Sequence, residues 1–128
     1  LIDPHPPSKK LCTLLKQVLE IDAGATFATS RRVRLDQWEK CTVGDLVLQL
    51  CDGAMTVGVV EWHASCDVAG EVSIISSLRV WEFVSGSDRS WKYRRTLETH
   101  VCMTDEIKCT LIYAGAGEIA TVLKPAHV

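Results

Sequence analysis

In TVGDLVLQLCDGAMTVGVVEW, residues 42 to 62, two short apolar runs meet at Asp52-Gly53. In the first run leucines recur at every second position, which is the period of a strand with one face turned to the core. Aspartate and glycine tolerate the positive φ that a two-residue hairpin turn requires. The stretch therefore predicts an antiparallel hairpin, with Gln49 among the residues on its polar face.

The segments that follow also have the composition of strands. Residues 71–84 are rich in β-branched and aromatic side chains, but their apolar face changes near Ser76-Ser77, which indicates a bend or bulge. Residues 91–102 alternate cleanly, and two shorter runs end before Pro125. Because no helical pattern separates these strands, we predict a strongly bent antiparallel barrel of about six strands over residues 42–125.

The residues before the hairpin contain one amphipathic helix. We predict it over residues 8–22, with Ser8 as N-cap and Gly24 placed to stop it. Its apolar stripe packs on the barrel, and residues 25–41 form a connecting arm with one short strand, so the fold class is α+β and mostly β. The stripe is formed by Leu11, Leu14, Leu15, Val18 and Leu19.

Length and composition narrow the class of protein. A chain of 128 residues, with 47% hydrophobic residues, predicts a single domain over 1–128. The net charge of −2 gives no general attraction to nucleic acid, so a basic site must be a local patch. We expect the six cysteines to be reduced in an intracellular protein, no membrane partner, and a chain that is a segment of a longer one.

Two strands of this pattern resemble a known family. VGDLVLQL followed by VGVVEW is similar to the first hairpin of SH3-like barrels, and in particular of bromo-adjacent homology (BAH) domains. VWEFV resembles the aromatic mid-domain strand of that family, and THVCMTDEIKCTLI resembles a later segment, so the similarity covers residues 42–113. The resemblance implies an SH3-like barrel in a nuclear, chromatin-associated module that binds histone or other peptides, in some members through an aromatic cage for methyl-lysine.

Aromatic and acidic residues of the predicted barrel are candidates for such a site. Several rings around a cation attract it by about 0.5 to 2 kcal/mol each, and an acid adds to this. The expected ligand is an extended peptide laid against an exposed sheet edge. The alternative is that the rings are core residues, as tryptophans in strands usually are. The candidate peptide-binding residues are Glu61, Trp62, Asp67, Trp91 and Tyr93.

Two basic clusters favour a different class, a barrel that binds nucleic acid. Arginines close to rings are what a phosphate backbone with unstacked bases requires, although such charges also occur on any solvated sheet face. A third possibility is an oligomerisation or scaffold domain, and we expect a monomer or a weak homo-oligomer. The two clusters are Arg31, Arg32 and Arg34 in the arm, and Lys92, Arg94 and Arg95 in the strand at 91–102.

Metal binding and catalysis have weaker support in the sequence. His63-x-x-Cys66 and His100-x-Cys102, followed by Cys109, supply soft ligands, but no CxxC occurs and the spacing is not that of a zinc site. The same His and Cys pairs lack the oxyanion-binding loop that a thiol nucleophile needs. We therefore predict a non-enzymatic protein with no metal and no cofactor.

Overall fold

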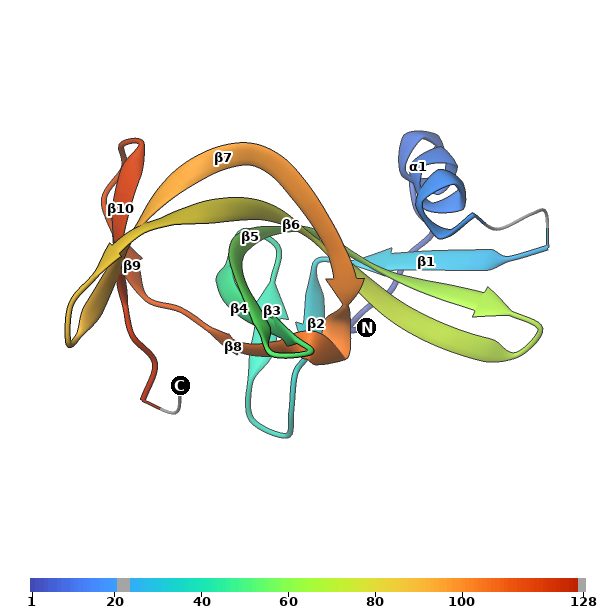
Figure 1. The fold of residues 1–128 in the computed structure, drawn as a ribbon. Coiled ribbons are helices and arrows are strands. Elements are labelled where there is room, and N and C mark those ends of the chain that lie inside the picture. Colours follow the sequence, from blue (N-terminus) through green and yellow to red (C-terminus); the bar gives the residue numbers. More distant parts are fainter. Residues whose placement is uncertain (21–23, 127–128) are drawn as a thin grey trace.

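The computed structural model describes residues 1–20 and 24–126 and shows a mostly β protein with one α-helix in that part of the chain (Figure 1). The elements in chain order are α1 (Lys9–Leu19), β1 (Thr26–Ser30), β2 (Arg32–Arg34), β3 (Lys40–Thr42), β4 (Leu46–Cys51), β5 (Ala54–Val68), β6 (Glu71–Gly86), β7 (Ser90–Met103), the short 3-10 helix η1 (Thr104–Glu106), β8 (Ile107–Thr110), β9 (Tyr113–Ala114) and β10 (Ile119–Leu123).

Eight of these strands form one antiparallel sheet in the order β8-β4-β5-β6-β7-β10-β9, with β1 paired to β5, while β2 and β3 form a separate two-stranded ribbon. The predicted closed barrel of about six strands is wrong, because within residues 1–20 and 24–126 no ladder joins β8 to β9. The physical reason is strand length. β5, β6 and β7 have 15, 16 and 14 residues, roughly 45 to 55 Å at 3.3 Å per residue. β6 runs the length of the molecule, whereas β5 extends from the middle to the end near α1, and β7 runs from the opposite end to the middle (Figure 1).

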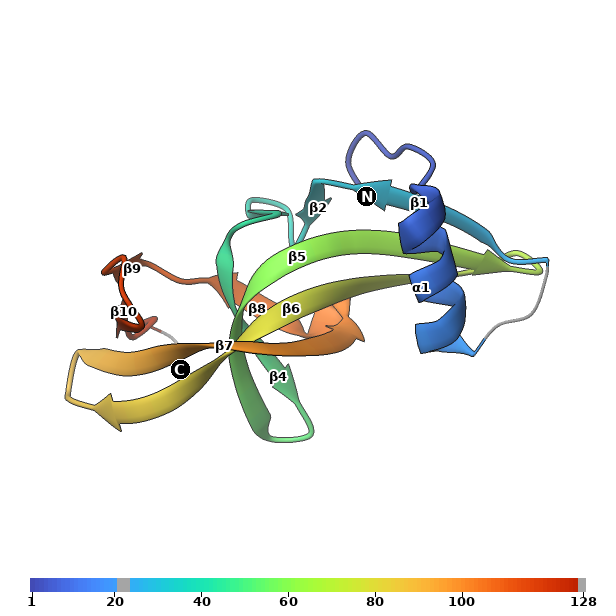
Figure 2. The same ribbon diagram turned by 90° about the horizontal axis from the view of Figure 1, so that it is seen from above.

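The partner strands are too short to close this sheet. β4 pairs with β5 only over residues 54–59, and β10 pairs with β7 only over residues 90–94. The far halves of β5 and β6 extend past these partners; β1 pairs with β5 there, and α1 lies over both strands (Figure 2). An SH3-like barrel needs short strands that return to each other, so the sheet here is open and bent rather than closed.

The hairpin at residues 42–62 is confirmed. Asp52 and Gly53 have φ of 49° and 81°, the pair of positive values that a tight two-residue turn between β4 and β5 needs. The predicted bend near Ser76-Ser77 is confirmed as well, since the β5–β6 register shifts where Glu61 bulges opposite this point. Gln49 was expected on a polar face but is buried, because neighbouring elements cover both faces of β4.

The bend divides the apolar interior into three clusters. One cluster contains Trp81 and Val122 and lies where β4 and β10 meet the long strands β5, β6 and β7. A second, with Val33 and Leu78, lies under the β2–β3 ribbon and β8. The third lies beneath the helix and is centred on the fully buried Leu15. Each half of the bent sheet therefore has its own core.

The helix begins as predicted, since the Leu11 amide donates to Ser8 Oγ over 3.2 Å. It ends at Leu19, where Glu20 takes the left-handed conformation with φ of 51°, rather than at residue 22 with Gly24 as the stop. Residues 21 and 22 of the predicted helix lie outside the described part of the chain.

The connecting arm predicted over residues 25–41 is instead largely strand. It contains β1, β2 and the start of β3, and the N-terminal segment runs beside them through bridges from Ile2 to Arg32 and from His5 to Thr29. The pattern was hidden because the inward-facing residues, Phe27 and Val33, are separated by small and basic ones.

Candidate functional site

The structure does not bring the two candidate tryptophans together. Trp62 pairs with Ser77 and packs against the cluster beneath α1. Trp91 pairs with Gly86 and Val122 in the other half of the bent sheet. Within residues 1–20 and 24–126 the two tryptophans therefore do not share a pocket, and of the three predicted rings Trp91 and Tyr93 are the ones that lie together.

The two candidate acids have structural partners. Glu61 accepts hydrogen bonds from Arg79 Nη2 at 2.8 Å and from Ser77 Oγ at 3.4 Å, across the bulge. Asp67 Oδ1 accepts from the Gly70 amide at 3.0 Å and stabilises the β5–β6 turn. Neither carboxylate is placed beside Trp91, so the predicted pairing of rings with acids is absent from this site.

An aromatic groove does exist beside Trp91, with a volume of about 410 Å³. It lies where β5 and β6 diverge, because their ladder starts only at Val57 opposite Trp81. Beyond that point residues 54–56 of β5 pair with β4 and residues 82–86 of β6 pair with β7. Within the described residues each of these segments therefore has one edge without a ladder partner. The β4–β5 and β6–β7 hairpins point in different directions beyond Val57 and Trp81 (Figure 1). The main side chains of the groove are Met55, Thr56, Trp81, Phe83, Trp91 and Tyr93.

The rings of the groove are set nearly at right angles. The Phe83 and Tyr93 centroids are 5.6 Å apart with an interplanar angle of 76°, and those of Trp91 and Tyr93 are 6.1 Å apart at 81°. Phe83 is 55% exposed while Tyr93 is only 3% exposed. Burial raises the pKa of the Tyr93 phenol, which favours its neutral form. Phe83 therefore presents an exposed ring to the groove, next to the buried ring of Tyr93.

The charges near the groove are positive. Lys124 Nζ lies 5.9 Å from the Trp91 ring centroid, and the Arg95 guanidinium lies 4.6 Å from that of Trp81. Within the described part of the chain, no carboxylate lines the groove. Rings alone would also attract a methylated lysine, but the neighbouring Lys124 and Arg95 repel a second cation, and they therefore favour an apolar side chain as the occupant.

The second basic cluster is occupied by internal contacts. Arg94 forms ion pairs with Glu82 at 3.7 Å and Glu118 at 3.4 Å. Arg95 donates to the carbonyl oxygens of the β9–β10 turn, and Lys92 Nζ donates to Thr121 Oγ1 at 3.2 Å. These residues hold β10 and its turn against β7, so they are poorly available to a phosphate backbone.

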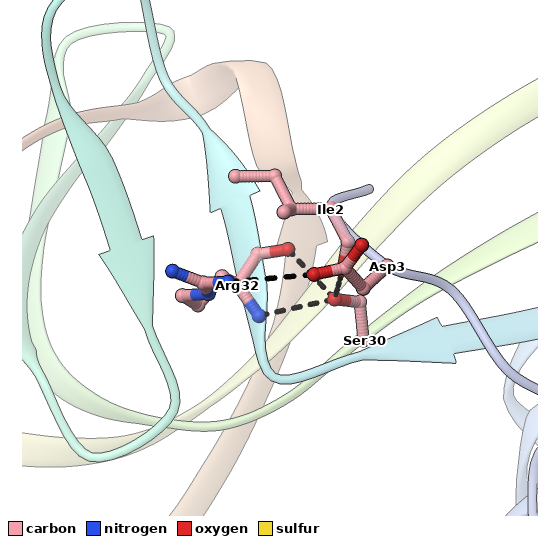
Figure 3. Close-up of polar contacts among 4 residues, drawn as sticks. All are labelled: Ile2, Asp3, Ser30 and Arg32. Atoms are coloured by element: carbon pink, nitrogen blue, oxygen red, sulfur yellow. Dashed lines mark hydrogen bonds and ion pairs between the residues drawn. The ribbon is translucent and has the colours of Figure 1, made fainter.

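The first basic cluster is only partly occupied. Arg32 Nη2 contacts Asp3 Oδ2 at 3.5 Å, in a segment that Ser30 Oγ holds by hydrogen bonds to Ile2 and Arg32 (Figure 3). Arg31 is exposed, and its carbonyl accepts from the Val43 amide. Arg34 forms no ion pair within the described residues.

The His and Cys residues considered as metal ligands or nucleophiles are dispersed, and the described residues contain no group of three that could hold a metal ion. His63 is fully buried, with Nδ1 2.6 Å from Ser76 Oγ, and that hydroxyl is 2.7 Å from Thr104 Oγ1. Burial lowers the pKa of His63 to about 4 and raises the pKa of the Cys102 thiol to about 12. All six cysteines are free.

No family model, curated protein or solved structure matches this chain. The part of the chain that the structure describes also contains no helix long and apolar enough to cross a membrane.

Two residues that matter for the groove were missing from the sequence-based site. Neither Phe83 nor Met55 is among the residues that the sequence predicted for the site. Phe83 lies directly opposite Tyr93 in the β6–β7 ladder, so correct strand register alone would have joined it to the candidate rings. Register depends on turns and bulges far from the pair, which the local pattern did not reveal.

Proposed function

We propose that this protein is a non-enzymatic recognition module that binds an extended peptide of a partner protein at the aromatic groove. The observation that carries the proposal is the divergence of β5 and β6 around perpendicular rings, which leaves free strand edges beside an exposed Phe83. The similarity of residues 42–113 to BAH domains supports a chromatin setting, with a histone-type peptide as the partner.

The two parts of the groove have separate roles in this proposal. The free edges at residues 54–56 and 82–86 offer main-chain hydrogen bonds to an added strand, as in other cases of β-augmentation. The rings then select one side chain of the peptide. A volume of about 410 Å³ is at the small end of ligand sites, which fits one bulky residue rather than several. Leucine, phenylalanine or methionine suits an apolar site bordered by Lys124.

The proposal is tested on an array of histone-tail peptides, with and without methyl-lysine, together with designed peptides whose central residue is leucine, phenylalanine or lysine. We expect binding by peptides with an apolar central residue. Burying one such side chain is worth about 1.5 to 3 kcal/mol, so Phe83→Ala should weaken binding by roughly 10- to 100-fold. Leu97→Ala is the matched control, since this side chain is 86% exposed and does not line the groove.

Two results would count against the proposal. One is the absence of binding by every peptide of the array, and the other is equal affinity of Phe83→Ala and the parent chain. Trp62→Ala separates packing from binding. Because Trp62 packs beneath α1, this variant should lower the unfolding temperature and leave the peptide affinity of the folded fraction unchanged.

A further inference from the structure

The β2–β3 ribbon has one face in the core and one in solvent. Val33 and Cys41 are paired across the ribbon and both are buried. Side chains alternate along a strand, so Arg34 and Lys40, which are also directly paired, share the opposite face. Both are exposed. Arg32 lies two residues before Arg34 and extends this basic face toward the N-terminal segment (Figure 3).

Two like charges opposite each other are an unfavourable arrangement. Such a cross-strand pair opposes folding, whereas a pair of opposite charges would stabilise the ribbon. Within residues 1–20 and 24–126, neither Arg34 nor Lys40 forms an ion pair. Asp105 lines the same hollow of about 300 Å³ as Arg34 without reaching ion-pair distance. The chain is acidic by two charges, so this concentration of positive charge is a local feature.

The turn of the same ribbon presents an exposed ring. Trp38 is 86% exposed, yet its backbone is fixed, because Asp36 Oδ1 accepts from the amides of Trp38 and Glu39, each at 2.7 Å. Glu39 Oε1 in turn accepts from the amide and hydroxyl of Thr110 in β8, at 3.0 and 2.8 Å. Asp36 and Glu39 thus both accept hydrogen bonds from within the protein. The Trp38 ring is exposed on a turn whose backbone these bonds hold in place.

We propose that the outward face of the β2–β3 ribbon binds a single strand of nucleic acid, with Arg34 and Lys40 contacting phosphate and Trp38 stacking on a base. Single strands offer both an anionic backbone and unstacked bases, the two features that these side chains match. A duplex hides its base faces from Trp38, and an acidic peptide has no base to stack on it. This site goes beyond the proposed peptide site and shares no residue with the aromatic groove.

The test measures fluorescence anisotropy of labelled oligonucleotides of about 12 nucleotides, oligo(dT) and oligo(U), with a duplex of the same length for comparison. We expect both single strands to bind more tightly than the duplex, and the ratio of their affinities assigns DNA or RNA as the preferred source. Trp38→Ala should weaken binding by roughly 5- to 100-fold. With two phosphates contacted, raising salt from about 50 to about 200 mM should cost about sevenfold in affinity.

The charge variant Arg34→Ala/Lys40→Ala should remove most of this salt dependence without loss of stability, since it relieves a like-charge pair. The matched control is Lys9→Ala/Lys10→Ala, which removes the same charge from exposed positions in the first turn of α1. Leu97→Ala is the control for Trp38→Ala, because both side chains are 86% exposed. Thermal unfolding verifies that each variant folds.

Three results would overturn the inference. They are equal weakening by the Lys9/Lys10 control, equal binding of duplex and single strand with no effect of Trp38→Ala, and binding of an oligoglutamate peptide in preference to both oligonucleotides. The outcome is independent of the peptide site, because Phe83→Ala should leave oligonucleotide affinity unchanged. A chain that binds oligonucleotides but no peptide would refute only the proposed function.

Discussion

Lowering the pH from neutral toward 5 should destabilise this protein through the buried His63. The imidazole is fully buried beside Ser76, and burial lowers the pKa of His63 from 6.5 to about 4. In the unfolded chain the same group takes up a proton near pH 6.5. The folded pKa is the depressed one, so the stability that neutral His63 contributes is present above pH 6.5 and is lost as the pH falls toward 4.

The size of the effect follows from these two pKa values. Linkage gives a loss of about 2 kcal/mol in the free energy of unfolding at pH 5 and about 3 kcal/mol at pH 4, relative to neutral pH. Between about pH 7 and pH 5 the loss of stability reports mainly on His63, because the reference pKa values of carboxyl groups are lower. His5 and His100 are exposed, and His127 lies outside the described residues.

Urea unfolding at several pH values between about 7 and 5 measures this loss directly. The control is His63→Gln, which keeps a hydrogen-bonding side chain beside Ser76 but has no proton to gain in this range. We expect the variant to be less stable at neutral pH and nearly independent of pH down to 5. A second measurement, NMR titration of the ring protons in the folded chain, should show His63 neutral at pH 5. Equal pH slopes in the two proteins, or a His63 ring that titrates near pH 6.5 in the folded chain, would show that burial of this ring does not cause the loss.

Two further predictions concern packing. In Gly58→Ala the new Cβ would lie 2.7 Å from the Arg79 carbonyl oxygen, a backbone atom of the neighbouring strand, so the β5–β6 ladder must shift. We expect the free energy of unfolding, measured with urea, to fall by about 1 to 3 kcal/mol. A fall below about 0.5 kcal/mol would show that the two strands can move apart at little cost. Arg95→Lys keeps the charge but loses the planar fork that binds two carbonyls of the β9–β10 turn and stacks on Trp81. Hydrogen exchange in β10 should become at least several-fold faster, and unchanged protection would mean that the charge alone suffices.

Part of the site was open to prediction from the residues. Trp91 and Tyr93 are two positions apart in a strand, so they share a face whatever the rest of the fold does. Trp62 is the contrary case. Its strand was predicted well, but the Glu61 bulge and the cover of α1 decide that its ring packs beneath the helix instead of joining Trp91.

The basic residues show the same division. Arg34 and Lys92 look alike in the sequence, since each stands in a short run of cations. In the structure Lys92 and its neighbours are occupied by β10 and its turn, whereas Arg34 faces Lys40 across a ribbon that was predicted as a connecting arm. Whether a charge has a partner depends on a strand from elsewhere in the chain, and no local pattern contains that strand.

Features that depend on neighbouring residues could be predicted from the residues alone: the turn at Asp52-Gly53, the start of the helix at Ser8, and the strand character of the second half. These follow from backbone dihedral preferences and side-chain period, which act over a few residues. The open sheet and the pairing of Phe83 with Tyr93 became evident only in the folded chain. Those outcomes depend on how far each long strand extends beyond its partner, and that is set by pairing between segments tens of residues apart.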